Sequence, residues 1–94
     1  MSPPTFEWDS RKATANQRRH GVSFKEATTA FRDPMARIHE DPEHSFDERR
    51  EILVGYSTVG RLLLVAFLER DGKIRLISAR RATRDERKNH EENS

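Results

Sequence analysis

Hydrophobic residues are concentrated between positions 51 and 79, in three short runs that predict an antiparallel meander. Leu62–Leu68 consists almost entirely of Leu, Val, Ala and Phe, and it is too short for a helix of normal length, so it is typical of a buried strand. Lys73–Arg80 alternates apolar and polar residues and predicts a second strand. Asp71-Gly72, between them, is a pair preferred in two-residue turns with positive φ. Glu51–Ser57 predicts a third strand, so we expect the hairpin in residues 60–80 to form the central pair of the sheet.

Alternation also assigns side chains of the last strand to faces. One face would carry Ile74, Leu76 and Ser78, and the other Arg75, Ile77 and Ala79. Arg61 begins the middle strand and Arg80 ends the last one. Because neighbouring antiparallel strands bring these two ends together, we expect both arginines on one open face.

The N-terminal third predicts a short edge strand, Thr5–Trp8, followed by a helix. Asp9 is a good N-cap for this helix, which would run through about His20 and end at Gly21. The helix is polar, and we expect it to lie over the edge of the sheet.

A second helix is predicted to begin at a capping box, in which Ser23 caps the helix and Glu26 reaches back. Phe24, Ala27 and Phe31 recur at helical spacing, and Asp33-Pro34 would end the helix. We expect its aromatic edge to pack on the sheet.

Three further elements complete the expected order. Met35–Glu40 predicts a strand, residues 41–45 a loop, and Thr83 with Glu86 a capping box that opens a C-terminal helix without an apolar face. The order β-α-α-β-β-β-β-α predicts an α+β fold, with a small, mostly antiparallel sheet of three to five strands. Two N-terminal helices would pack on one face of this sheet, and a C-terminal helix would follow.

Composition restricts the class of protein. We expect 94 residues to form a single domain, with residues 1–4 and about 92–94 disordered. The chain has no cysteine, and no run approaches a membrane span or a signal peptide, so we expect a cytoplasmic protein without a disulfide framework. Arginine outnumbers lysine 14 to 4, which suits phosphate contacts but also fits a GC-rich genome.

Motifs for nucleotide binding, zinc binding and serine hydrolysis are absent. The histidines are scattered singly, and a lone histidine is usually a capping or surface residue. The remaining signal is a set of arginines on the meander: Arg50, Arg61, Arg75 and Arg80. They would grip a phosphodiester backbone from an uncovered sheet face, or they would protect strand edges from aggregation.

The sequence resembles the BrnT family over almost its whole length. The resemblance is carried by FEWD (6–9), HGVSF (20–24), DPEHS (41–45), REILVGYS (50–57), GRLLLV (60–65) and IRLISAR (74–80). The family implies a RelE-like fold and the toxin half of a type II toxin–antitoxin pair. One departure is His90, because the family usually shows tyrosine there, as in the C-terminal tyrosine that assists catalysis in some RelE-like toxins.

The resemblance implies an endoribonuclease that needs no metal and no cofactor, in which a ribose 2′-OH attacks the adjacent phosphate. It also implies an antitoxin with a ribbon-helix-helix domain, operator DNA bound through that antitoxin, and a 2:2 heterotetramer. We expect Arg61, Arg80, His44 and His90 to be catalytic, and Arg50, Arg75 and His20 to bind RNA. Among the histidines, His44 is the first candidate for acid–base work.

Two other functions stay open. A decayed or purely regulatory toxin would bind its partner and repress its own operon without cleaving RNA, and the histidine at position 90 favours this alternative. A stand-alone DNA-binding regulator is less well supported, because the sequence contains no helix-turn-helix or other reading element.

Overall fold

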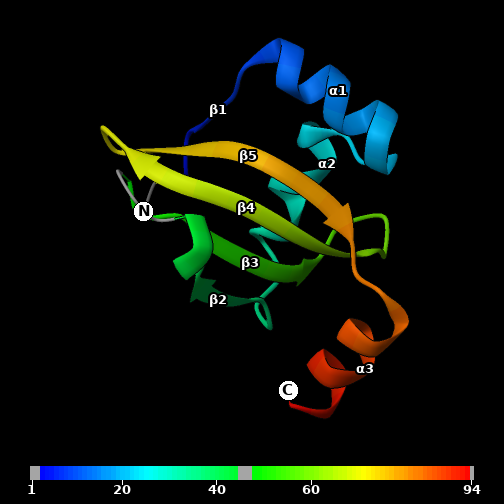
Figure 1. Ribbon diagram of the computed structural model, residues 1–94. Coiled ribbons are helices and arrows are strands. Elements are labelled where there is room, and N and C mark those ends of the chain that lie inside the picture. The colour runs from blue at the N-terminus through cyan, green and yellow to red at the C-terminus, as the bar shows by residue number, and fades with distance from the viewer. Residues whose placement is uncertain (1–2, 45–47, 94) are drawn as a thin grey trace.

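A five-stranded sheet forms the centre of the molecule (Figure 1). The computed structural model describes residues 3–44 and 48–93, with His44 described in its backbone only. The strands are β1 (Phe6–Glu7), β2 (Arg37–Glu40), β3 (Glu51–Tyr56), β4 (Leu62–Arg70) and β5 (Lys73–Arg81), in the order β1-β5-β4-β3-β2. Only β1 runs parallel to its neighbour, β5. The predicted α+β fold is confirmed, and the hairpin of β4 and β5 lies at the centre of the sheet.

The helices lie on different sides of this sheet. They are α1 (Ser10–His20), α2 (Phe24–Ala30) and α3 (Arg84–Glu92), and a 3-10 turn, η1 (Pro42–His44), follows β2. Figure 1 shows α1 and α2 together on one side and α3 apart from them, beyond the end of β5. The expected disorder falls partly on residues 1, 2 and 94, which lie outside the described residues, and it stays a prediction.

Most helix ends follow the predicted caps. The exceptions are both on α2: it ends at Ala30, with Phe31 as its C-cap, rather than at Asp33-Pro34, and its N-terminal capping box is incomplete. Asp9 caps α1, Gly21 ends it with φ of 69°, and Thr83 forms a complete capping box at α3. Ser23 caps α2 by accepting a hydrogen bond from the amide of Glu26 at 3.0 Å. The carboxylate of Glu26, however, does not reach back to the cap. It binds Arg61 on the β3–β4 connection, so the capping box predicted at Ser23 is only half formed.

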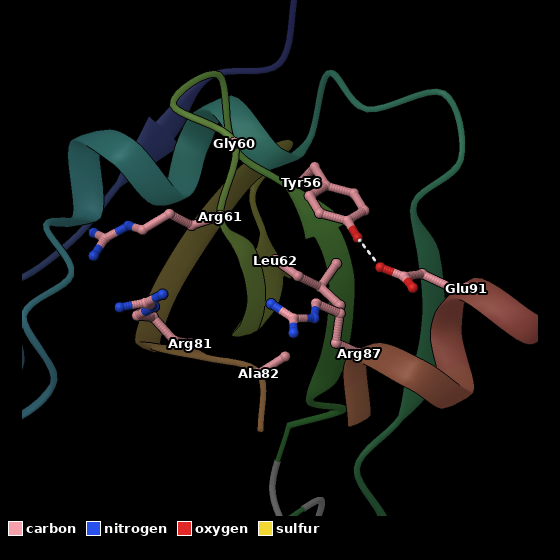
Figure 2. Close-up of a pocket in the computed structure, with 8 residues that line it drawn as sticks. All are labelled: Tyr56, Gly60, Arg61, Leu62, Arg81, Ala82, Arg87 and Glu91. Carbon is pink, nitrogen blue, oxygen red and sulfur yellow. Dashed lines mark hydrogen bonds between the residues drawn. The ribbon is translucent and has the colours of Figure 1, made fainter. Parts of the chain in front are cut away.

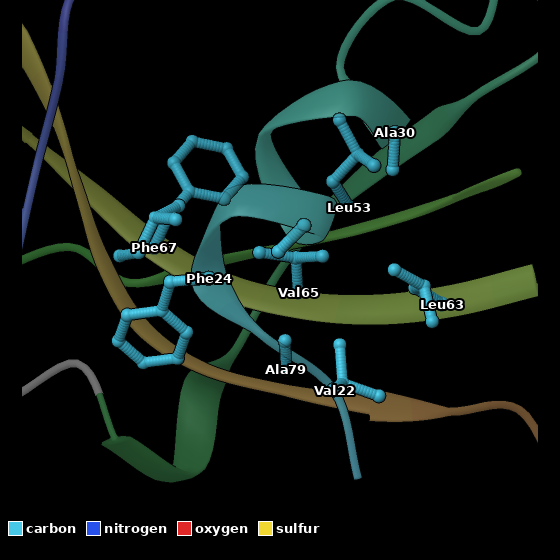
Figure 3. Close-up of a cluster of buried hydrophobic side chains, with 10 residues drawn as sticks. Val22, Phe24, Ala30, Leu53, Leu63, Val65, Phe67 and Ala79 are labelled. Atoms are coloured by element: carbon cyan, nitrogen blue, oxygen red, sulfur yellow. The ribbon is translucent and has the colours of Figure 1, made fainter. Parts of the chain in front are cut away.

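The hydrophobic core lies between α2 and one face of the sheet (Figure 3). Val22, Phe24, Ala27 and Ala30 come from α2 and the residues before it, and they pack on Leu53, Leu63, Val65, Phe67, Leu76 and Ala79 of the strands. Phe31 packs edge-on against Phe6 and Phe67, with ring centroids 5.0 and 5.1 Å apart. The predicted aromatic edge of the second helix is therefore confirmed.

A β-bulge changes the faces of β5. The register pairs Ala66 with Ser78 but Phe67 with Leu76, so Ile77 is an extra residue on β5. The extra residue shifts the alternation by one, because a strand's side chains have a period of two. Ala79 therefore lies on the core side, and Arg80 lies on the opposite face. The strict alternation expected from the sequence is wrong beyond Leu76.

The turn predicted at Asp71-Gly72, between β4 and β5, is confirmed: φ is 53° at Asp71 and 76° at Gly72.

Asn16 attaches α1 to the outer edge of β5. β1 pairs with β5 only at Ile74 and Arg75, which leaves the edge near Ala79 without a strand neighbour. The Asn16 side chain replaces that neighbour: Oδ1 accepts from the Ala79 amide at 3.0 Å, and Nδ2 donates to the Ala79 carbonyl at 2.9 Å. Nδ2 also donates to the Val22 carbonyl at 2.9 Å. This confirms that the first helix lies at the sheet edge, and it fixes β5 directly before its two terminal arginines.

Candidate functional site

The face of the sheet opposite α2, here called the open face, carries half-buried apolar residues. The strand register places Ile52, Val54, Tyr56, Leu62, Leu64, Ala66, Ser78 and Arg80 on it. A hollow of about 150 Å³ lies on this face, lined by His20, Asp41, Ile52, Leu64, Ala66, Ser78 and Arg80. The open face is therefore apolar at its centre, and His20, Arg80 and Asp41 border this centre.

The basic residues predicted to bind RNA fall on or beside the open face. His20 lines the hollow from the end of α1. Arg75 pairs with Leu68 across the hairpin, and its Nη1 lies 3.8 Å from Oε1 of Glu7. Arg50 precedes β3, two positions before Ile52, and its carbonyl accepts from the Asp41 amide at 3.0 Å. The structure thus brings His20 and Arg80 together, whereas their RNA-binding or catalytic roles stay predictions.

Arg80 joins the open face to α3. Its Nη1 and Nη2 donate to the two carboxylate oxygens of Glu86, both at 2.8 Å. Glu86 also accepts from the Thr83 amide at 2.8 Å, so one carboxylate closes the capping box and binds the arginine. The bidentate pair raises the pKa of Arg80, and the hydrogen bonds from Arg80 lower the pKa of Glu86 from 4.5 to about 2. The pair holds the first turn of α3 against β5.

Acid is expected to loosen α3 through Glu86. The folded-state pKa lies below the usual value, so the Glu86 carboxylate stabilises the fold above about pH 4.5, and this contribution is lost as the pH falls toward 2. Glu86→Gln keeps an acceptor for the cap but removes the charge. We expect its stability in urea titrations to be lower at pH 6 and to fall less between pH 4.5 and 3. The matched control is Asp85→Asn, an exposed carboxylate in the same turn, which should keep the wild-type pH dependence.

Arg61 lies on the side of the sheet that faces α2. Its Nε donates to Oε2 of Glu26 at 2.9 Å, its Nη2 donates to Oε1 of Glu26, and Nη2 also donates to the Gly21 carbonyl at 3.1 Å. These bonds raise the pKa of Arg61 and lower that of Glu26. Arg80 pairs with Leu64 on the other face, so the expectation that Arg61 and Arg80 converge on one face is wrong. The β-bulge is the reason, because it turns Arg80 away and Arg81 toward Arg61.

Polar side chains of α2 and the following loop hold the β3–β4 connection in place. Ser57 Oγ donates to Glu26 at 2.8 Å, and the Thr58 amide donates to Thr29 Oγ1 at 3.0 Å. The Tyr56 amide donates to Asp33 at 2.8 Å. The segment that carries Tyr56 and Arg61 is therefore attached to the helix layer at three successive residues.

A basic pocket, here called the arginine pocket, lies between this connection and α3 (Figure 2). Its volume is about 300 Å³, and it is lined by Tyr56, Gly60, Arg61, Leu62, Arg81, Ala82, Arg87 and Glu91. Arg81 pairs with Leu63 and thus lies on the same side of the sheet as Arg61. Figure 2 shows Arg87 extending from α3 toward the ends of β4 and β5. Three arginines and one glutamate are among the lining residues, and such a lining suits an anion.

Two of these arginines are available to a ligand. Within residues 3–44 and 48–93, the guanidinium groups of Arg81 and Arg87 make no hydrogen bond and no ion pair, and both residues are exposed. Arg81 acts on Glu26 only through its charge, which contributes to the lowered pKa of that carboxyl after the hydrogen bonds of Arg61 and Ser57. A planar guanidinium group can donate two hydrogen bonds to two oxygens of one phosphate, so this arrangement suits a phosphate group.

Tyr56 and Glu91 line the arginine pocket on the side of α3, and His90 packs against Tyr56. The Tyr56 hydroxyl donates to Oε1 of Glu91 at 2.9 Å, and the rings of Tyr56 and His90 meet edge-on with centroids 6.1 Å apart. His90 is only 7% exposed, so it lies behind Tyr56 rather than at the pocket's surface. A catalytic role for His90 stays a prediction. His44 lies at the end of η1, and its side chain lies outside the described part of the chain.

The sequence did not indicate four of the polar or charged lining residues: Tyr56, Arg81, Arg87 and Glu91. Arg81 follows Arg80, and adjacent strand residues point to opposite faces, so the pair Arg80-Arg81 already implied one arginine on each face. Arg87 lies one turn after Thr83 in the predicted helix, and the capping box fixed its position on that helix. The sequence does not show the direction in which α3 leaves β5, and this direction places Arg87 at the pocket.

The described residues contain no helix that is long and apolar enough to cross a membrane.

Comparison with known proteins identifies the family. No curated protein matches the sequence. The crystal structure of the Brucella abortus ribonuclease toxin BrnT superposes with a TM-score of 0.67 at 19% identity, over 86% of this chain and 99% of that one, which shows a shared fold. The family model described as "Ribonuclease toxin, BrnT, of type II toxin-antitoxin system" matches residues 8–86. The chain therefore belongs to the BrnT family of ribonuclease toxins of type II toxin–antitoxin systems.

Proposed function

We propose that this protein is an endoribonuclease that binds a scissile phosphate of RNA in the arginine pocket and uses no metal ion. The observation that carries the proposal is the pair Arg81 and Arg87, whose guanidinium groups have no hydrogen-bond or ion-pair partner among the described residues, in a pocket that Arg61 also lines. Guanidinium groups held around a phosphate stabilise the negative charge that grows on it during cleavage. Membership in a family of ribonuclease toxins supports the same conclusion.

The open face supports a path for the RNA on either side of the scissile phosphate. Tyr56 and Leu62 border both the arginine pocket and the open face, so a strand leaving the pocket would cross the apolar centre of the sheet. Aromatic and apolar surfaces accept unstacked bases, and the basic side chains at the margin accept phosphates. In this arrangement His20, Arg50, Arg75 and Arg80 contact the RNA outside the cleavage site, as the sequence predicted for the first three.

The test is cleavage of a single-stranded RNA by the purified toxin in the presence of EDTA. We expect products that end in a 2′,3′-cyclic phosphate and a 5′-hydroxyl, and no reaction with the all-deoxy oligonucleotide, because the 2′-hydroxyl is the nucleophile. Expression without the antitoxin should arrest growth. A toxin that neither cleaves RNA nor arrests growth, yet still binds its antitoxin, would establish the non-enzymatic alternative.

We propose that the antitoxin carries a ribbon-helix-helix domain and covers the open face with acidic and apolar side chains. The lining of the hollow supports this, because its apolar residues are bordered by His20 and Arg80, with one carboxylate, Asp41, beside them. Since a ribbon-helix-helix domain is built from two chains, two toxins would join in a 2:2 complex that binds operator DNA.

Hydrogen exchange with and without the antitoxin tests this surface. Protection is expected to rise in residues 75–92. Protection that rises only in α1 and α2 would show that inhibition does not act by covering the open face.

A further inference from the structure

Tyr56 lines the arginine pocket, and Figure 2 shows its ionisable hydroxyl directed toward Glu91 of α3; Arg87 is the pocket arginine whose charge acts on this hydroxyl. The position of Tyr56 is fixed at both ends: the backbone amide donates to Asp33 at 2.8 Å, and the hydroxyl donates to Glu91 at 2.9 Å. The ring is held edge-on by His90. Within the described residues, no other neutral hydroxyl donor lines this pocket.

We propose that Tyr56 is the proton donor to the leaving oxygen during RNA cleavage in the arginine pocket, and that Glu91 is the positioning residue for its hydroxyl. This inference rests on the proposed function. A hydroxyl that already donates to a carboxylate on the pocket wall needs only a rotation about its C–O bond to donate to a phosphate ester oxygen instead. The arginines cannot take this role, because a guanidinium group does not give up its proton near neutral pH.

The step balances without a metal or a redox partner. The ribose 2′-oxygen forms a bond to phosphorus, and its proton passes to solvent water. The bond between phosphorus and the 5′-oxygen breaks, and the Tyr56 proton moves to that oxygen. The phenolate of Tyr56 then takes a proton from solvent, and the products are a 2′,3′-cyclic phosphate and a 5′-hydroxyl. The arginines hold the phosphate oxygens throughout.

The charges around Tyr56 keep it protonated until it is needed. Its hydrogen bond to Glu91, with burial as a second cause, raises the pKa of Tyr56 above the usual value of 10. Arg87 opposes this change through its positive charge, and Asp33 adds to it. The ionisable groups that act on or contact Tyr56 are Asp33, Arg87, His90 and Glu91, and Arg61 and Arg81 line the same pocket. Tyr56 is thus a donor over the whole physiological pH range.

The decisive experiment compares two leaving groups in Tyr56→Phe. With ordinary RNA, the variant should cleave about 100-fold more slowly than wild type, because general acid catalysis is removed. With RNA that carries sulfur in place of the scissile 5′-oxygen, the leaving thiolate needs no proton, so the variant should cleave nearly as fast as wild type. Affinity for the all-deoxy oligonucleotide should be unchanged within about twofold.

Glu91→Gln tests the positioning role through the pH profile. Glutamine keeps an acceptor for the Tyr56 hydroxyl but has no charge, so the alkaline limb of kcat/KM should move to lower pH. Glu92→Gln, an exposed neighbour on the same helix, is the matched control and should leave the profile unchanged.

The outcomes separate the inference from the proposed function. Wild type that cleaves neither substrate contradicts the proposed function itself. Two results would overturn the role of Tyr56 when the wild type cleaves RNA. In the first, Tyr56→Phe is equally slow on both substrates; in the second, it is fully active on ordinary RNA. If the alkaline limb of the kcat/KM profile does not move in Glu91→Gln, Glu91 does not position the Tyr56 hydroxyl. Thermal melts of each variant accompany the rates, and the sulfur substrate serves as an internal test that the Tyr56→Phe pocket is intact.

Discussion

Alanine at Arg81 and Arg87 together is expected to abolish RNA cleavage and growth arrest while leaving the fold intact. Both arginines are exposed, and their guanidinium groups make no hydrogen bond or ion pair to other described residues, so their removal breaks no such bond. Each one removed from a phosphate in the transition state should lower kcat about 100-fold. Cleavage assays, growth curves and thermal melts of the single and double variants measure this.

Arg84→Ala is the matched control, because it removes an exposed arginine from the first turn of α3, outside the arginine pocket. The Arg81 and Arg87 variants should also differ from the Arg84→Ala control in how their affinity for RNA depends on salt concentration. Each arginine that no longer neutralises a phosphate lowers the slope of log K against log salt by about 0.7 for a single strand. If the double variant cleaves as fast as the Arg84 control, the arginine pocket does not hold the scissile phosphate.

Local patterns were sufficient to predict the elements but not the faces of the last strand. The hairpin turn, the caps at Asp9 and Thr83, and the order of elements depend on residues close together in sequence. The bulge at Ile77 depends on how β4 and β5 fit over the core, and no residue at that position marks it. One extra residue exchanged the faces of Arg80 and Arg81, and the candidate site moved with them.

Glu26 shows the same limit at the level of one side chain. A glutamate three residues after a serine is typical of a capping box, and the sequence offers no reason to reject one. In the fold, Arg61 comes within reach, and a bidentate bond to a guanidinium group is stronger than a bond to a backbone amide. Long-range partners of this kind cannot be inferred from spacing. In this structure, the hydrogen bonds from Arg61 to Glu26 hold the Arg61 side chain beside α2.

Asn16→Ala is expected to produce the largest loss of stability of any single change on α1. The side chain is 7% exposed and makes three hydrogen bonds to backbone groups, two of them on Ala79. Alanine leaves those groups buried without partners, and each costs about 1 kcal/mol or more, so the total is about 3 kcal/mol. For a domain of this size the melting temperature should fall by about 12 °C or more.

Gln17→Ala is the control, because that side chain is exposed on the same helix and alanine is at least as good a helix former. Asn16→Asp separates geometry from hydrogen bonding: it keeps the acceptor for the Ala79 amide but turns both donated bonds into repulsion between oxygens. We therefore expect it to be at least as damaging as alanine at pH 7. Loss of protection at the Ala79 amide in hydrogen exchange should accompany the lower melt. A melt within about 2 °C of the Gln17 control would mean that β5, and with it Arg80 and Arg81, is held in place without the asparagine.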